Sequence, residues 1–194
     1  MITSIHIIGC GHVGYLISQL IPSIPTINKI YLYDSGCFDN LDVVMGIFPT
    51  FDCKHRMNKA ISAQLKLLEK YQNIKVEAFT RRIEKIDRNN MSGLIIDCTD
   101  TKMKYNLHCD FSVSADGNCA VIDGTDYTTR VGIDSDYSDK SQIKLFKLLA
   151  KEVINYINKK AYKSKLKLIF KLTKGRVEYI NGYRTQATSS AGTE

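Results

Sequence analysis

Three glycines near the N-terminus carry the clearest chemical signal in this sequence. Gly9, Gly11 and Gly14 form the pattern G-x-G-x-x-G between an apolar run typical of a buried strand and the start of a predicted helix. The first glycine permits a tight turn, the second lets the backbone approach phosphate, and the third lets the helix pack on the strand. Asp34, 20 positions after Gly14, ends a second predicted strand and is placed to accept hydrogen bonds from both ribose hydroxyls. These residues predict a nucleotide site. The motif does not separate NAD from ATP, and an ordinary strand-to-helix turn contains the same glycines.

Four short segments follow this motif in a fixed order. They are Asn40-Leu41, Lys59-Ala60 in a long predicted helix, Asp97-Cys98-Thr99-Asp100 at the end of a predicted strand, and Val121-Ile122-Asp123-Gly124. In this order the chain resembles the ThiF-type (MoeB/ThiF-like) family of adenylating enzymes, which activate ubiquitin-like and sulfur-carrier proteins. The resemblance covers residues 4–180, and Asp-Cys-Thr-Asp is its most distinctive part.

The resemblance implies a site for ATP and Mg²⁺. Asp34 would hold the ribose, Lys59 and Asn40 would face the phosphates, and Asp100 would ligate Mg²⁺, a cation that prefers carboxylate and phosphate oxygens. In such enzymes the carboxylate at the C-terminus of the carrier attacks the α-phosphate and pyrophosphate leaves. Two simpler interpretations stay open: Lys59 as a surface lysine in a first helical turn, and Asp100 as the N-cap of the next helix.

The sequence departs from the family pattern where positive charge is expected. With Asn40 aligned, the family's Asn-Arg-Gln becomes Asp42-Val43-Val44, so the phosphate-binding arginine is absent. Arg56, three residues before Lys59, is a candidate replacement, and His12 in the glycine loop is either a phosphate donor or a surface residue. The first predicted strand begins within five residues of Met1, so we also expect the family's N-terminal helix, which carries a second arginine into the neighbouring subunit, to be missing. Three functions therefore stay open: adenylating enzyme, non-catalytic nucleotide-binding regulator or assembly subunit, and, third in order, NAD-dependent oxidoreductase.

The elements that would position these residues alternate between strands and helices. This pattern predicts an α/β fold: a Rossmann-like, doubly wound, mostly parallel sheet with helices on both faces and a C-terminal antiparallel hairpin. Strands are predicted at 4–8, 29–34, 74–79, 93–98, 119–123 and 128–133, with the hairpin at 165–172 and 176–180. Helices are predicted at 11–21, 55–71, 102–115 and 141–158, and residues 35–54 are predicted to be irregular.

Composition limits the remaining possibilities. The chain has 194 residues, 44% hydrophobic and 24% charged, which indicates a single globular domain over residues 1–182 and a polar, disordered tail at 183–194. Six isolated cysteines without a Cys-x-x-Cys pair argue against a zinc site and for the reducing cytoplasm. No apolar run reaches the ~20 residues of a membrane span.

The net charge of +7 is unevenly distributed along the chain. Residues 140–176 contain twelve Lys or Arg and one Glu. This surplus fits either an acidic partner or a solvated helix face, and we expect weak or absent nucleic-acid binding. The resemblance also implies a homodimer.

Overall fold

The apolar run before the glycine motif forms β1 (Ser4–Ile8), in which every residue is buried. On either side of it lie β2 (Lys29–Tyr33) and β4 (Leu94–Asp97), both parallel to β1. Helices or loops cover both faces of such a central strand and neighbouring strands cover both edges, which explains its nearly continuous run of isoleucine.

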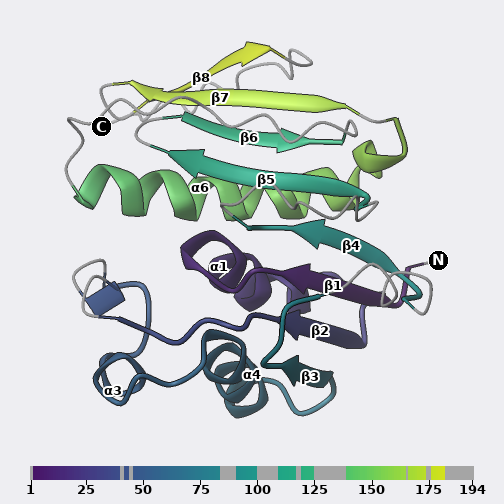
Figure 1. The fold of residues 1–194 in the computed structure, drawn as a ribbon. Helices are drawn as coiled ribbons and strands as arrows, with labels where there is room; N and C mark the ends of the chain where they lie inside the picture. Colours follow the sequence, from purple (N-terminus) through teal and green to yellow (C-terminus); the bar gives the residue numbers. More distant parts are fainter. Residues whose placement is uncertain are drawn as a thin grey trace, which may run out of the picture.

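The computed structural model describes residues 2–39, 42–43, 46–83, 91–99, 109–116, 119–124, 139–164, 166–173 and 176–181. In these ranges eight strands form one sheet in the order β3-β2-β1-β4-β5-β6-β7-β8 (Figure 1). The strands from β3 to β5 are parallel, and β6, β7 and β8 extend the sheet in antiparallel fashion. The bounds not yet given are β3 Lys75–Phe79, β5 Phe111–Asp116, β6 Cys119–Asp123, β7 Lys167–Thr173 and β8 Arg176–Asn181.

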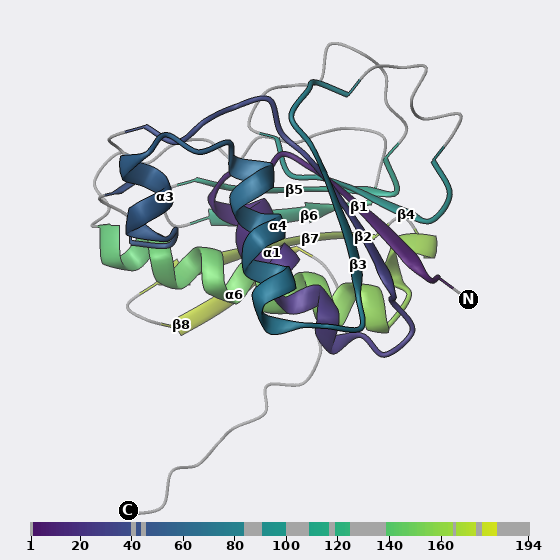
Figure 2. The same ribbon diagram turned by 90° about the horizontal axis from the view of Figure 1, so that it is seen from below.

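Three long helices pack side by side on one face of the sheet. The α1 helix (His12–Leu20) contacts both α4 (Lys59–Lys70) and α6 (Asp139–Asn158) (Figure 2). All three contribute to the main core, together with Ile5 and Ile7 of β1. The shorter helices are η1 (Ile21–Ser23), α3 (Thr50–Lys54) and η2 (Ala161–Ser164). None of the helices in the described ranges is long and apolar enough to cross a membrane.

The opposite face has a smaller core that includes Ile8 and Ile95. Aromatic rings stack there on paired strand positions, with 4.5 Å between the centroids of His6 and Tyr31. The connections from β3 to β4 and from β4 to β5 contain residues 84–90 and 100–108, which lie outside the described ranges. Helical cover of this second face therefore stays a prediction.

The predicted fold class is confirmed: the chain forms a mixed α/β sheet with parallel strands and a C-terminal β7–β8 hairpin. The predicted helix at 102–115 is wrong at its end, because 111–116 form β5. In this segment Phe111 and Val113 are buried in the main core and Ser112 between them is half-buried, a period of two that marks a strand. Residues 102–108, the predicted strand at 128–133 and the tail at 183–194 lie outside the described residues.

Two further boundaries differ from the prediction. The segment predicted to be irregular contains the short helix α3 at its end. The long helix predicted from residue 55 begins at Lys59, because Asn58 caps it and Arg56 has a left-handed backbone with φ of 50°.

Phe170 provides a test of the prediction that residues 1–182 fold as one domain. Its side chain in β7 is fully buried, whereas Phe51 in α3 is 64% exposed. Phe170→Ala should lower the free energy of unfolding by about 3–5 kcal/mol because it leaves a cavity. The chain should still unfold in one transition. Urea denaturation followed by circular dichroism measures both the free energy of unfolding and the number of transitions.

Phe51→Ala, the control, should change the free energy of unfolding by less than about 0.5 kcal/mol. Two transitions, only one of which responds to Phe170→Ala, would contradict a single domain.

Candidate functional site

The glycine loop lies where the chain reverses its order across the sheet. From β1 the chain proceeds outward to β2 and β3, then returns to β4 on the other side of β1. Gly9, Asp34 and Cys98 directly follow the carboxyl ends of β1, β2 and β4. In open parallel sheets, ligands bind outside the carboxyl ends of the strands at such a reversal. The topology therefore places the predicted nucleotide residues at one edge of the sheet.

The three glycines of the motif have different surroundings. Gly9 has φ of +86°, and a Cβ there would lie 3.0 Å from the backbone of Cys98 and Thr99. A Cβ on Gly14 would lie 1.9 Å from the carbonyl oxygen of Gly9. A Cβ on Gly11 would have no neighbour within 4 Å among the residues that the structure describes. Gly9 and Gly14 thus let the loop pack against the residues that follow β4 and let α1 pack against the loop, whereas Gly11 has free space beside it in the described ranges.

No capping hydrogen bond joins the N-terminus of α1 to a side chain within the described ranges. Gly11 is its N-cap, and no acidic residue stands in the first turn. The first N–H groups of a helix lack partners within the helix, and the helix dipole makes this end positive. Together with the open space at Gly11, this end of α1 is suited to an anion such as phosphate.

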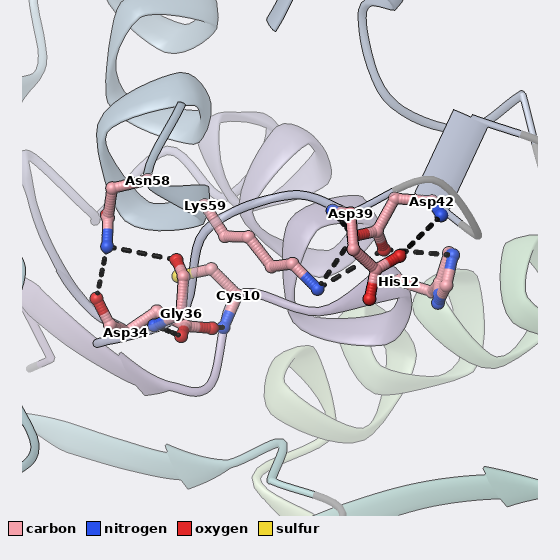
Figure 3. Close-up of polar contacts among 8 residues, drawn as sticks. All are labelled: Cys10, His12, Asp34, Gly36, Asp39, Asp42, Asn58 and Lys59. Carbon is pink, nitrogen blue, oxygen red and sulfur yellow. Dashed lines mark hydrogen bonds and ion pairs between the residues drawn. The ribbon is translucent and has the colours of Figure 1, made fainter. Parts of the chain in front are cut away.

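Asp34 connects the loops that follow β1 and β2. Its Oδ2 accepts a hydrogen bond of 2.7 Å from the Cys10 N–H, and its Oδ1 accepts one of 2.7 Å from the Gly36 N–H (Figure 3). A carboxylate oxygen has more than one lone pair, so each oxygen can still accept a ribose hydroxyl. Asp34 is half-buried and lies at the carboxyl edge of the sheet, and its ribose contact stays a prediction.

Asn58 was not recognised from the sequence, yet it fixes the start of α4. Its Oδ1 accepts hydrogen bonds from the N–H groups of Ala60 and Ile61, at 2.9 and 3.2 Å. Its Nδ2 donates to the carbonyl oxygens of Asp34 and Gly36, at 2.8 and 3.0 Å. An asparagine just before an amphipathic helix is the usual N-cap signal and would have identified it. Asn58 thereby places Lys59 in the first turn beside the Asp34 loop.

The Lys59 side chain lies in a buried ion pair. Its Nζ is 3.0 Å from Oδ2 and 3.2 Å from Oδ1 of Asp42, and 5.8 Å from the centre of the Phe38 ring. The side chains are 19% exposed for Lys59 and 5% for Asp42. Lys59 is therefore not a solvated surface lysine, and its ammonium group is held by a carboxylate. No sequence pattern indicates this role for Asp42.

Asp42 is held in place by its own loop. Its Oδ2 accepts a hydrogen bond of 2.9 Å from the Asp39 N–H, and its N–H donates to Oδ1 of Asp39 at 3.2 Å. This reciprocal pair resembles the capping arrangements by which short polar side chains fix a turn.

His12 lies beside the same carboxylate. Its Nε2 is 3.8 Å from Oδ1 of Asp42, too far for a hydrogen bond, and this buried atom has no partner among the described residues. The imidazole packs against Phe48 and Phe146, with ring centres 4.9 and 5.6 Å away. Burial lowers the pKa of His12 despite the opposing effect of Asp42, so the ring is neutral near pH 7. A neutral imidazole with its hydrogen on Nε2 can donate to a phosphate oxygen.

Three predicted site residues remain: Arg56, Asn40 and Asp100. Arg56 is exposed in the turn between α3 and α4, and no ion pair or hydrogen bond of its guanidinium to another described residue is present. Asn40 and Asp100 lie outside the described residues, so the predicted Mg²⁺ ligand stays a prediction. Over the ranges the structure covers, no group of three or more His, Cys, Asp or Glu side chains is arranged to hold a metal ion.

Asp97 at the end of β4 is buried, and burial raises the pKa of its carboxyl group. The backbone N–H and the hydroxyl of Thr99 donate to its Oδ1 at 2.9 and 2.7 Å. These two bonds oppose the effect of burial and fix the backbone that follows β4. The first acid of Asp-Cys-Thr-Asp therefore shapes the loop.

Solved structures share this fold. They include Escherichia coli MccB, with a TM-score of 0.64 and 16% identity over 99% of this chain and 66% of MccB. They also include selenomethionine PaaA, with a TM-score of 0.63 and 17% identity over 91% of this chain and 63% of PaaA. E. coli MccB with ATP has a TM-score of 0.62 and 16% identity, over 98% and 66%. At such identities the likeness defines the fold alone, and the chain spans less than two thirds of the length of these three neighbours. No protein-family model and no curated protein sequence matches the chain.

Gly14 and Gly11 allow the packing role of the loop to be separated from its ligand role. Gly14→Ala should lower the free energy of unfolding by about 1–3 kcal/mol, because its methyl group would meet the Gly9 carbonyl oxygen. Gly11→Ala should change the free energy of unfolding by less than about 1 kcal/mol, since it adds a methyl group to open space at the N-cap. Denaturant titration of both variants measures these values.

Gly11→Ala also tests where an anion binds. If a phosphate binds at the N-terminus of α1, this variant should weaken the binding of phosphate ligands, measured by calorimetry, because the methyl group occupies the space beside the α1 N–H groups. Undiminished affinity in Gly11→Ala would place the phosphates elsewhere.

Proposed function

We propose that this protein binds ATP at the carboxyl edge of its sheet and adenylates the C-terminal carboxylate of a polypeptide. The observation that carries the proposal is the convergence of the uncapped α1 N-terminus, Asp34 and Lys59 beside the reversal of strand order. The donor set suits a nucleotide: helix N–H groups, His12 and an ammonium group for the phosphates, and a carboxylate for the ribose. The shared fold with MccB, a protein solved with ATP and with AMPCPP, supports this choice of nucleotide.

Each residue then has a defined task. Asp34 would orient the nucleotide through the ribose, and Lys59 would neutralise phosphate charge. Asp100 would supply the Mg²⁺ ligand, with Asn40 and Arg56 as further phosphate contacts. The carboxylate displaces pyrophosphate from the α-phosphorus, which forms an acyl-adenylate. The contribution of the protein is alignment and compensation of charge in this in-line displacement.

For the acceptor we propose a ubiquitin-like or sulfur-carrier protein. The ThiF-type order of motifs supports this choice. The fold neighbour MccB has been solved in complex with N-formylated MccA, so a protein of this fold can bind a partner of its own. We further propose that the protein acts in the cytoplasm as a homodimer, as the resemblance implies.

A second candidate is a non-catalytic nucleotide-binding regulator or assembly subunit. Two observations favour it: Asp42 neutralises Lys59, and Val43 stands where the family has its phosphate-binding arginine. Loss of cations aimed at a triphosphate reduces transition-state stabilisation more than it affects the fold.

Asp34 provides the test of nucleotide binding. Asp34→Ala should weaken the binding of ATP–Mg²⁺ by about 1.5–3 kcal/mol, the range for hydrogen bonds to a charged group. Calorimetry on folded protein measures the change, with AMP, NAD⁺ and NADP⁺ as competing ligands. Glu69→Ala is the control, because Glu69 is an exposed acid on α4 paired with Lys66. Equal affinity in Asp34→Ala and wild type would remove Asp34 from the site, and preference for NAD⁺ would favour an oxidoreductase.

Exchange of labelled pyrophosphate into ATP tests the chemistry. We expect slow exchange by the isolated protein, or exchange that requires a partner supplying the missing cation, as an arginine finger does. Asp100→Ala should abolish it. Rapid exchange by the isolated protein would show that other groups, Arg56 among them, replace the family arginine. Binding without exchange under any condition would favour the non-catalytic candidate.

A further inference from the structure

The ammonium group of Lys59, which is expected to bind phosphate, is already paired with the carboxylate of Asp42. The Nζ of Lys59 contacts both carboxylate oxygens of Asp42, at 3.0 and 3.2 Å. Two oxygens beside an ammonium group match what a nucleotide phosphate would offer. Figure 3 shows Lys59 extending from the start of α4 toward Asp42, away from the Asp34 contacts.

A ligand phosphate cannot simply be added to this pair. Asp42 is 5% exposed and is fixed by the Asp39 N–H. If Lys59 turned to a phosphate, Asp42 would keep a buried negative charge without a cation, which is strongly unfavourable. A phosphate placed near both groups would also be repelled by the carboxylate. The cost of either arrangement subtracts from the affinity for the phosphates.

Two groups near Asp42 are not hydrogen-bonded to its carboxylate: Nε2 of His12 and the first N–H groups of α1. Among the described residues, the buried Nε2 of His12 has no hydrogen-bond partner and the N-terminus of α1 has no capping side chain. These groups favour an anion at the end of the helix. The Asp42 carboxylate is instead paired with Lys59, and its Oδ1 lies 3.8 Å from Nε2, too far for a hydrogen bond. With its hydrogen on Nε2, His12 joins the α1 N–H groups in favouring a phosphate, whereas the Asp42 carboxylate opposes it.

We propose that Asp42 is a specificity-determining residue, which competes with ligand phosphates for Lys59 and lowers the affinity of the site for polyphosphates. The proposal deepens the proposed function and rests on it for the identity of the nucleotide. Adenosine, which has no phosphate, is unaffected by this competition. The ratio of ATP affinity to adenosine affinity therefore depends on Asp42.

The experiment compares three probes: ATP, adenosine and inorganic tripolyphosphate, at one fixed Mg²⁺ concentration. Asp42→Asn keeps the side-chain shape and an acceptor for the Asp39 N–H but removes the charge. We expect it to tighten the binding of ATP and tripolyphosphate about tenfold, the gain of one charge-assisted contact, and to leave adenosine affinity unchanged. Calorimetry gives all three constants. Asp42→Ser, which also lacks the charge, serves if Asp42→Asn does not fold.

Two controls isolate the role of the ion pair. Glu69→Gln removes the same charge from an exposed pair on α4 and should change none of the three affinities. In a Lys59→Met background, Asp42→Asn should give much less of the gain, because the competition acts through Lys59.

The outcomes separate this inference from the proposed function. If ATP and adenosine bind but neither Asp42 variant tightens ATP or tripolyphosphate, Asp42 has no such role. If tripolyphosphate binding tightens while neither adenosine nor ATP binds, the role of Asp42 holds and the nucleotide assignment is wrong. If a gain of equal size persists in Lys59→Met, the carboxylate acts by general repulsion and the competition for Lys59 is refuted.

Discussion

The Asp34 carboxylate is the contact on which the arrangement of the site depends. It accepts one backbone N–H from the glycine loop and one from its own loop, and the Asp34 carbonyl oxygen accepts a hydrogen bond from Asn58. One residue therefore joins the loops after β1 and β2 to the start of α4. Hydrogen bonds to an ionised acceptor are stronger than neutral ones, and here they involve backbone groups that cannot move independently of the sheet. The same residue that would recognise a ribose also fixes the loops of the candidate site.

The second constraint on the candidate site is the balance between its positive and negative side chains. Among the described residues, the candidate site contains the ammonium group of Lys59, the carboxylates of Asp34, Asp39 and Asp42, and an imidazole kept neutral by burial. The pair of Lys59 and Asp42 has no net charge before a ligand arrives, unlike the strongly cationic clamp by which other proteins hold triphosphates. A paired cation is stabilised without ligand, but for the proposed adenylation it gives up part of the electrostatic attraction that would accelerate the departure of pyrophosphate. The proposed site is therefore better suited to binding a nucleotide than to activating it without help.

The basic C-terminal third has a structural explanation of its own. On α6, Leu145, Leu149 and Val153 are buried, while Lys144, Lys147 and Lys151 are exposed at helical spacing. The helix thus buries one face against α1 and the sheet and presents its lysines to water. This distribution agrees with a solvated helix face, and weak or absent nucleic-acid binding stays a prediction.

The sequence by itself determined what depends on short-range pattern: the glycine turn, the acid after β2, the alternation of strands and helices, and the final hairpin. These follow from local conformational freedom and from the periodicity of burial. Where the periodicity was misread, at Phe111–Asp116, the prediction was also wrong. Only the tertiary structure decided that Asp42 holds Lys59 and that Nε2 of His12 is buried without a partner in the part of the chain that the structure describes. These contacts join residues far apart in the sequence, such as His12 with Asp42 and with Phe146, and they depend on how distant segments pack around the N-terminus of α1, which no local pattern specifies.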